Sequence, residues 1–126
     1  MGFNFEKLEV YQLAIDFVND IYSLTKEFPK EEMFGITSQL RRAAVSISLN
    51  IAEGSARSKK DFSRFIDIAR GSIYECVTVS QISLKQGYLS REAFVNSENK
   101  LTSLSKMLSC LKRSMTEEFS ATNHEL

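Results

Sequence analysis

Four basic residues in the middle of the chain carry side chains that could bind phosphate groups: Arg57, Lys59, Lys60 and Arg64. Arg57, Lys60 and Arg64 follow one another at intervals of three and four residues, a spacing that places side chains on one face of a helix. Lysine and arginine bind the nucleic-acid backbone by neutralising phosphates, so such contacts are salt-sensitive and read no base sequence. The alternative is a solvated helix end, because exposed charge runs often bind nothing specific.

A second set of polar residues lies within largely apolar sequence and comprises Arg42, Asn50, Glu53 and Glu75. Asn50 and Glu53 are three residues apart, and Arg57 follows Glu53 by four, which allows an ion pair along a helix. Buried polar groups need hydrogen-bonding partners. We therefore interpret the four residues as a structural polar network, with a polar contact for a binding partner as the alternative.

The sequence contains none of the common catalytic or cofactor motifs. Glycine-rich phosphate and dinucleotide loops, GxSxG and HExxH are all absent. The single histidine, His124, lies in a polar C-terminal segment, so the Glu-x-x-His pattern of carboxylate di-iron bundles is absent as well. We predict no catalytic residue, no metal site, no cofactor and no enzymatic activity. An enzyme stays an alternative only if a closed polar pocket forms around Glu53, Glu75 and an arginine.

The two cysteines, Cys76 and Cys110, each occur within an apolar helical pattern. Free cysteine in such a setting behaves as a small hydrophobic residue, so we predict that both are buried. A redox pair is the alternative, and it would require Cα atoms within about 7 Å of each other.

Charge is balanced overall but unevenly distributed along the 126 residues. Residues 1–35 carry three lysines against seven acids, whereas residues 36–72 carry seven bases against three acids. The asymmetry is consistent with pairing between helices or with a surface for an anionic partner. No apolar run reaches membrane-spanning length, and the N-terminus lacks the pattern of a signal peptide. We therefore expect a cytoplasmic protein.

Apolar residues recur at helical spacing in four segments separated by short polar stretches. The segments are about 5–28, 37–55, 58–86 and 90–118, with Thr37, Ser58 and Ser90 as predicted N-caps. Pro29 and Gly87 end the first and third segments. In the fourth segment, positions 94, 97, 101, 104, 108, 111 and 115 form a heptad seam. Short connections imply antiparallel neighbours, so we predict an all-α, up-down-up-down four-helix bundle spanning residues 1–118, with a disordered tail at 119–126.

The second and third segments contain more apolar residues than one core-facing stripe can hold. Residues 39–57, for example, read QLRRAAVSISLNIAEGSAR and are apolar almost all the way round a helix. Gly71, in the middle of the third segment, indicates close packing against another helix. A single four-helix core would leave part of this apolar surface exposed, which predicts homo-oligomerisation.

Several stretches resemble one known family of bacterial four-helix bundles, encoded within intervening sequences of 23S ribosomal RNA genes. The most specific stretch reads QLRRAAVSIS-x-NIAEG-x-x-R and is followed by F-x-x-F-x-x-I-A-R-G-S. FEKLEVYQLAIDF and QGYLS add to the resemblance, which spans about residues 3–115. The chain departs from the family at Tyr11, where tryptophan is frequent, and at Ser48, where proline is frequent. Because proline kinks a helix, its absence at Ser48 leads us to expect a straighter second helix.

The resemblance implies a left-handed up-down bundle that assembles into a homopentamer. The accessory variability protein of diversity-generating retroelements has the same kind of fold, is markedly basic, and associates with nucleic acid and a reverse transcriptase. This chain is neutral overall. The family name reflects gene location, so the resemblance implies the fold more firmly than a molecular role.

Together these observations lead to two hypotheses about function. The first is a non-enzymatic, cytoplasmic homopentamer that binds structured RNA or a ribonucleoprotein through Arg57, Lys59, Lys60 and Arg64. Arg41 and Arg42 are weaker candidates, because their helix is expected to be largely buried. The alternative is a protein-protein interaction scaffold that binds no nucleic acid. A contiguous basic surface would favour the first hypothesis, and pairing of these bases with acids of the first helix would favour the second.

Overall fold

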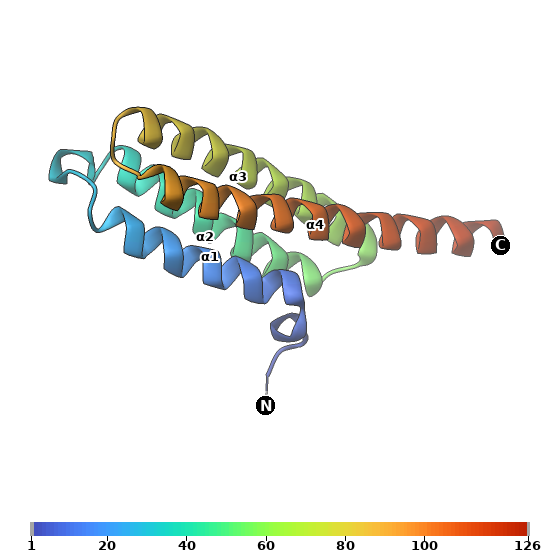
Figure 1. The fold of residues 1–126 in the computed structure, drawn as a ribbon. Helices are drawn as coiled ribbons and strands as arrows, with labels where there is room; N and C mark the ends of the chain where they lie inside the picture. Colours follow the sequence, from blue (N-terminus) through green and yellow to red (C-terminus); the bar gives the residue numbers. More distant parts are fainter. Residues whose placement is uncertain (1, 126) are drawn as a thin grey trace.

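The computed structural model of this chain is a bundle of four α-helices (Figure 1). They are α1 (Glu9–Thr25), α2 (Ile36–Ser55), α3 (Lys59–Lys85) and α4 (Arg91–Glu125), and two short 3-10 helices, η1 (Asn4–Lys7) and η2 (Lys30–Glu32), precede α1 and α2. The structure describes the backbone of residues 2–125 and the side chains as far as Met115. Successive helices run in opposite directions (Figure 1), which confirms the predicted all-α, up-down-up-down arrangement.

All four helices contribute to one hydrophobic core. Phe17, Leu40, Ile66 and Leu104 are fully buried representatives of α1, α2, α3 and α4. The predicted seam of α4 faces this core, since six of its seven positions are buried and Leu111 is half-buried. Burial of these side chains is the main source of stability, because removing one large apolar side chain from water contributes roughly 1.5–3 kcal/mol to the free energy of folding.

Two of the three predicted N-caps are confirmed. The Ser58 hydroxyl accepts a hydrogen bond from the Asp61 N–H at 3.2 Å, and the Ser90 hydroxyl accepts one from the Ala93 N–H at 3.1 Å. Each bond satisfies a donor that the first turn of a helix leaves without an intrahelical partner. Gly87, with φ of +80°, follows the end of α3 as predicted. The first predicted helix begins later than expected, at Glu9, because residues 4–7 form η1 instead.

The predicted cap at Thr37 is wrong. Gly35 occupies the N-cap position, and Thr37 lies buried within the first turn of α2, where its hydroxyl has no hydrogen-bond partner. The Glu32 carboxylate accepts a hydrogen bond from the Ile36 N–H instead, at 3.4 Å. Its other oxygen accepts one from the Tyr88 hydroxyl at 2.9 Å. The start of α2 is therefore fixed by a side chain from η2, which links it to the α3–α4 loop.

Two helical glycines have opposite surroundings. A Cβ atom on Gly54 would lie 2.6 Å from Cβ of Phe65 and 2.9 Å from Cδ1 of Phe62, so α2 and α3 meet closely at this point. A Cβ atom on Gly71 would meet nothing within 4 Å. The predicted close packing at Gly71 is therefore wrong within this chain, whereas Gly54 provides the close approach.

The bundle leaves several large apolar side chains exposed. They are Phe3, Ile15, Tyr22, Met33, Phe34, Leu49, Ile68, Tyr74, Ile82 and Val95. Leu49, Ile68, Tyr74 and Ile82 belong to α2 and α3, the two helices for which excess apolar surface was predicted. No helix in the described part of the chain is long and apolar enough to cross a membrane. The predicted disordered tail at 119–126, with His124, falls outside the residues whose side chains are described.

Candidate nucleic-acid interface

The four predicted phosphate-binding residues lie where α2 ends and α3 begins, and we call them the basic corner: Arg57, Lys59, Lys60 and Arg64. All four side chains are exposed. Lys59, Lys60 and Arg64 belong to the first two turns of α3, but Arg57 lies in the preceding turn. The prediction that Arg57 shares a helical face with Lys60 and Arg64 is therefore wrong, because the helix starts only after it.

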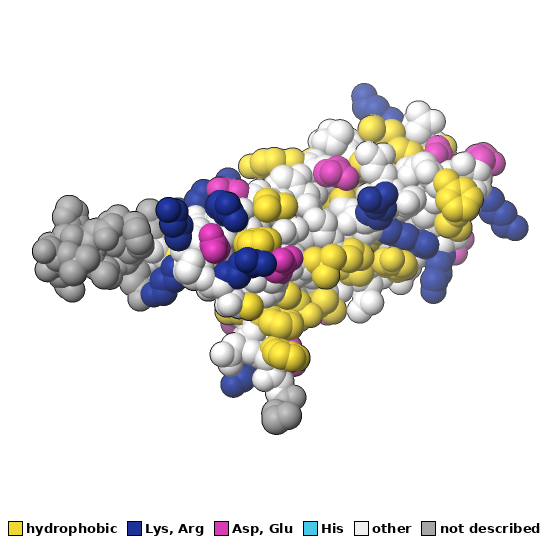
Figure 2. Space-filling view, turned by 180° about the vertical axis from the view of Figure 1, so that it is seen from behind, with side chains coloured by type: hydrophobic (Ala, Val, Ile, Leu, Met, Phe, Trp, Pro, Cys, Tyr) yellow, Lys and Arg dark blue, Asp and Glu magenta, His cyan; other side chains and the backbone are white. Residues whose placement is uncertain are grey.

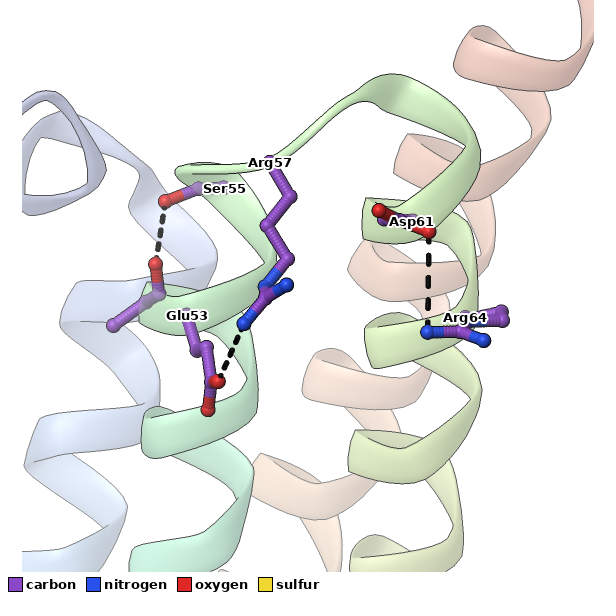
Figure 3. Close-up of polar contacts among 6 residues, drawn as sticks. Glu53, Ser55, Arg57, Asp61 and Arg64 are labelled. Atoms are coloured by element: carbon purple, nitrogen blue, oxygen red, sulfur yellow. Dashed lines mark hydrogen bonds and ion pairs between the residues drawn. The ribbon is translucent and has the colours of Figure 1, made fainter.

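Arg57 turns back along α2, toward Glu53 (Figure 3). Its guanidinium donates a hydrogen bond to Oε1 of Glu53 at 3.0 Å, which confirms the predicted pair. The guanidinium carbon also lies 5.0 Å from the centre of the Phe65 ring, a cation–π contact. Both members of the ion pair are about half exposed, and exposed pairs of this kind contribute little to stability. The contacts orient Arg57 without removing its charge from solvent.

Arg64 points away from α2 and lies beside Asp61 (Figure 3). The shortest distance between the two charged groups is 3.9 Å, and 73% of the Arg64 side chain is exposed. Asp61 contributes its N–H to the Ser58 cap, so the carboxylate is held at the first turn of α3. A phosphate could displace so open a pair at small cost.

The electrostatic surroundings of the basic corner are mixed. The first turn of α3 adds the partial positive charge of a helix N-terminus. Further along α3, the Asp67 carboxylate accepts hydrogen bonds from Lys112 of α4 at 2.7 and 2.9 Å. Figure 2 shows Lys and Arg side chains gathered at the end of the bundle next to the grey C-terminal residues, with acidic side chains between them. Two of the bases pair with acids of α2 and α3, namely Glu53 and Asp61, rather than with α1.

The predicted polar network is divided among separate contacts. The Asn50 side-chain amide donates to the carbonyl of Ser46 at 2.8 Å and to its hydroxyl at 3.1 Å. The Ser72 hydroxyl donates to the same Ser46 hydroxyl at 2.8 Å and so joins α3 to α2. Glu53 pairs with Arg57 instead of with these residues. Neither serine was singled out by the sequence, because their contact joins residues 26 apart.

Arg42 and Glu75 line a cavity of about 520 Å³ on the outer side of α2 and α3. The other residues around it are Phe34, Gly35, Ser38, Gln39, Ala43, Ser46 and Ser72. Glu53 is not among them, so this cavity is not the pocket around Glu53, Glu75 and an arginine that the enzyme alternative requires. No group of three or more His, Cys, Asp or Glu side chains that could hold a metal ion occurs among the described residues.

Arg41 has a structural role in the bundle. Its Nε donates a hydrogen bond to the Thr25 hydroxyl at 2.8 Å, and its guanidinium carbon lies 4.5 Å from the centre of the Tyr22 ring. Both partners belong to α1, so Arg41 ties the end of α1 to the start of α2. These contacts are consistent with the prediction that Arg41 is a weaker candidate for phosphate binding than the basic corner.

The two cysteines differ in environment. Cys76 is fully buried, and its burial, together with the charge of Glu75, raises the pKa of the thiol from 9.0 to about 12. Cys110 is exposed, so the prediction that both cysteines are buried is wrong for Cys110. Its position lies on the solvent side of the helix, next to the seam position 111. Both thiols are free.

The amino-acid sequence matches one known protein family over most of its length. Residues 6–110 match the family described as "23S rRNA-intervening sequence protein". The chain belongs to this family. The match covers the end of η1, all of α1, α2 and α3, and the first part of α4, including the whole basic corner. The resemblance noted in the sequence is therefore confirmed. No curated protein matches the chain.

A solved structure supports the assignment to the 23S rRNA-intervening sequence protein family. A protein of unknown function from the S23 ribosomal protein family of Bacteroides thetaiotaomicron VPI-5482 is 25% identical, with a TM-score of 0.76. The similarity covers 82% of this chain and 97% of the other. The shared fold therefore includes nearly all of the bacterial protein.

Proposed function

We propose that this chain is a non-enzymatic, cytoplasmic, self-associating bundle, assembled as a homopentamer, that binds structured RNA or a ribonucleoprotein through its basic corner. The observation that carries the proposal is the common exposure of Arg57, Lys59, Lys60 and Arg64 at one end of the bundle. The N-terminus of α3 adds to the attraction for phosphate. The contacts would be to phosphates rather than bases, so binding would follow the shape of the RNA.

Self-association would strengthen this binding. One chain offers few phosphate contacts, and Glu53 and Asp61 offset part of its charge. Repeating the basic corner around an oligomer would multiply the contacts available to one RNA. The exposed apolar residues of α2 and α3 supply surface for such an assembly, since large apolar patches are uncommon on monomers.

The test is fluorescence anisotropy of a labelled 23S-type RNA stem-loop titrated with protein across a salt series. We expect micromolar or tighter binding that weakens steeply with salt. Changing Arg57, Lys60 and Arg64 together to Gln should abolish binding while the fold survives. Any binding that this variant keeps at low salt should have a slope of log affinity against log salt that is shallower by about two to three, because three phosphate contacts have been removed.

A matched control removes three exposed bases from the other end of the bundle: Lys26, Lys85 and Arg91, each changed to Gln. This variant has the same net charge as the test variant, so it should keep most of the RNA affinity if location matters. Equal loss in both variants would show unspecific attraction, and unchanged affinity in the test variant would contradict the role of the basic corner.

The second candidate is a protein-protein interaction scaffold without nucleic-acid binding. The observation that favours it is the exposure of Leu49, Ile68, Tyr74 and Ile82 on α2 and α3. It predicts an oligomer with no RNA affinity even at low salt, where electrostatic binding is strongest.

A further inference from the structure

The cavity on the outer side of α2 and α3 has no part in the function proposed above. Its volume of about 520 Å³ lies within the range of small-molecule sites. Space remains between the two helices because several of the lining residues are small, namely Gly35, Ala43, Ser46 and Ser72. The cavity extends from the start of α2 to its middle, and Figure 1 shows that start at the end of the bundle opposite the α2–α3 turn. The cavity is therefore separate from the basic corner.

Two side chains of opposite charge line this cavity, Arg42 from α2 and Glu75 from α3. The hydrogen bond from the Ser72 hydroxyl to the Ser46 hydroxyl fixes the register of these antiparallel helices. Arg42 lies one turn from Ser46, and Glu75 lies one turn from Ser72, both toward the η2 end, so the two charges flank the cavity from different helices. Neither side chain forms a hydrogen bond or an ion pair within the part of the chain whose side chains are described. Both charges are available to a ligand that enters between them.

The Ser46 hydroxyl adds a hydrogen-bond donor to the cavity. It accepts one hydrogen bond from the Ser72 hydroxyl at 2.8 Å and another from the Asn50 side-chain amide at 3.1 Å. A serine hydroxyl has two acceptor sites and a single O–H, so both acceptor sites are occupied and the O–H is left for an acceptor atom of a ligand. Gln39, which also lines the cavity, carries an amide that both donates and accepts.

An aromatic ring lies at the rim of the same cavity. Phe34 lines it, and the side chain is 98% exposed. A bare aromatic ring beside polar groups is suited to stacking on a planar ring of a ligand, as in proteins that bind unpaired bases. The lining as a whole therefore fits a ligand with a planar ring, an anionic group for Arg42, and N–H donors for Glu75.

A guanosine phosphate combines these three features. The Watson–Crick edge of guanine carries two adjacent N–H donors, at N1 and N2, which match the two oxygens of one carboxylate. Adenine, cytosine and uracil each place an acceptor atom beside the donor on that edge, and a carboxylate would repel it. Arginine binds phosphate through parallel, charge-assisted hydrogen bonds. A free amino acid would also satisfy both charges, but its backbone offers no ring for Phe34 to stack on.

We propose that this cavity binds one guanosine 5′-phosphate group. The Glu75 carboxylate accepts from N1–H and N2–H of the base, the Arg42 guanidinium binds the phosphate, and the Phe34 ring stacks on the base. The group can come from a free nucleotide or from an unpaired guanosine of an RNA, since the recognising chemistry is the same. The inference goes beyond the basic corner, which contacts phosphates and reads no base, and it does not depend on RNA binding there.

Isothermal titration calorimetry with guanosine 5′-monophosphate tests the proposal. We expect one site per chain. Inosine 5′-monophosphate, which lacks the N2 amino group, and adenosine 5′-monophosphate should each bind about tenfold more weakly or worse. Glu75→Gln, Arg42→Gln and Phe34→Ala should each weaken the binding of guanosine 5′-monophosphate by about tenfold or more, because each removes one of the three contacts.

Matched controls make the same three changes at exposed positions outside the cavity: Glu92→Gln, Arg91→Gln and Phe3→Ala. These variants should bind guanosine 5′-monophosphate as the wild type does. Circular dichroism of every variant checks that the helices are retained, so that a loss of binding reports on the cavity and not on the fold.

Two stem-loop RNAs that differ in one unpaired loop residue, guanosine or adenosine, distinguish the sources of the ligand. A preference for the guanosine RNA that Glu75→Gln removes would assign an RNA residue to the cavity. Equal affinity for both RNAs, together with binding of guanosine 5′-monophosphate, would assign a free nucleotide.

The proposal is overturned if adenosine and guanosine 5′-monophosphate bind equally, or if Glu75→Gln leaves the affinity for guanosine 5′-monophosphate unchanged. It is also overturned if guanosine 5′-monophosphate does not bind at millimolar concentration and the two RNAs bind alike. Salt-sensitive binding of RNA at the basic corner would survive each of these results. Conversely, guanosine 5′-monophosphate binding that persists when Arg57, Lys60 and Arg64 are changed to Gln would show that the two sites are independent and would support the cavity.

Discussion

Two stripes of residues run along α3 with the same spacing of three and four residues, and their surroundings are opposite. The inner stripe comprises Phe62, Ile66, Ala69, Ile73, Cys76, Ser80 and Ser83, all buried. The outer stripe comprises Arg64, Ile68, Gly71, Glu75, Thr78 and Ile82, all exposed. The inner stripe ends in two serines while the outer stripe contains two isoleucines. Helical periodicity therefore marks candidate faces, and the neighbouring helices decide which one is buried.

The largest expected difference between buried and exposed positions concerns thiol chemistry. With a pKa of about 12, Cys76 is ionised in about one molecule in ten thousand at pH 8, and its burial excludes reagents as well. Exposed Cys110 serves as the internal reference. We expect one thiol per chain to react promptly with a disulfide reagent, and the second at least about a thousandfold more slowly. Prompt reaction of both thiols in the native protein would show that the inner stripe opens readily.

The same comparison can be made with matched isoleucines two residues apart. Ile66 is fully buried, whereas Ile68 is 52% exposed. Ile66→Ala should lower the free energy of unfolding by about 3 kcal/mol, and Ile68→Ala should change it by no more than about 0.5 kcal/mol. Urea denaturation measures both. A large, concentration-dependent loss for Ile68→Ala would mean that the outer stripe is covered by a second copy.

Gly54, which lies against the start of α3, tests a close approach between α2 and α3. Gly54→Ala places a methyl group 2.6 Å from Cβ of Phe65, so one of the helices must shift. We expect a loss of about 2 kcal/mol in the free energy of unfolding, despite the higher helix propensity of alanine. A stable, well-folded Gly54→Ala variant would show that the two helices can separate without cost.

Gly71, on the outer stripe, should give a change in the free energy of unfolding that is smaller than that of Gly54→Ala and opposite in sign. Nothing lies within 4 Å of a Cβ atom built there, so Gly71→Ala should gain about 1 kcal/mol from helix propensity. Thermal or urea unfolding at low protein concentration measures the gain. If Gly71→Ala instead weakened self-association, a helix of another copy would lie against this position.

The basic corner shows how far a site can be predicted from sequence. The pair between Glu53 and Arg57 was predictable because i,i+4 geometry is local. The contact between Arg57 and the Phe65 ring was not, because it depends on the turn that reverses the chain between α2 and α3. Lys112 and Asp67 are 45 residues apart in the sequence, and Ser72 and Ser46 are 26 apart. No local sequence pattern predicts contacts over such separations.

The helices themselves followed closely from the sequence, with errors at two starts. Apolar spacing located all four α-helices, and hydroxyl caps at Ser58 and Ser90 fixed two of the starts. The prediction of Thr37 as an N-cap was wrong because Glu32, from a separate turn, accepts the hydrogen bond of the first N–H of α2. Residues 4–7 form a 3-10 turn rather than the first turn of α1. Both errors occur where tertiary or short-range turn contacts replace the regular helical bond.

The sequence by itself determined the helices, their order and the all-α class, because these depend on propensity, capping and periodicity within a few residues. It also contained the motifs that mark the family. Only the tertiary structure decided that Gly54 rather than Gly71 lies at a close contact, that Cys76 is buried and Cys110 exposed, and that Phe34 projects from one end of the bundle. Burial is a property of what packs against a residue, and in a four-helix bundle those neighbours come from distant parts of the chain.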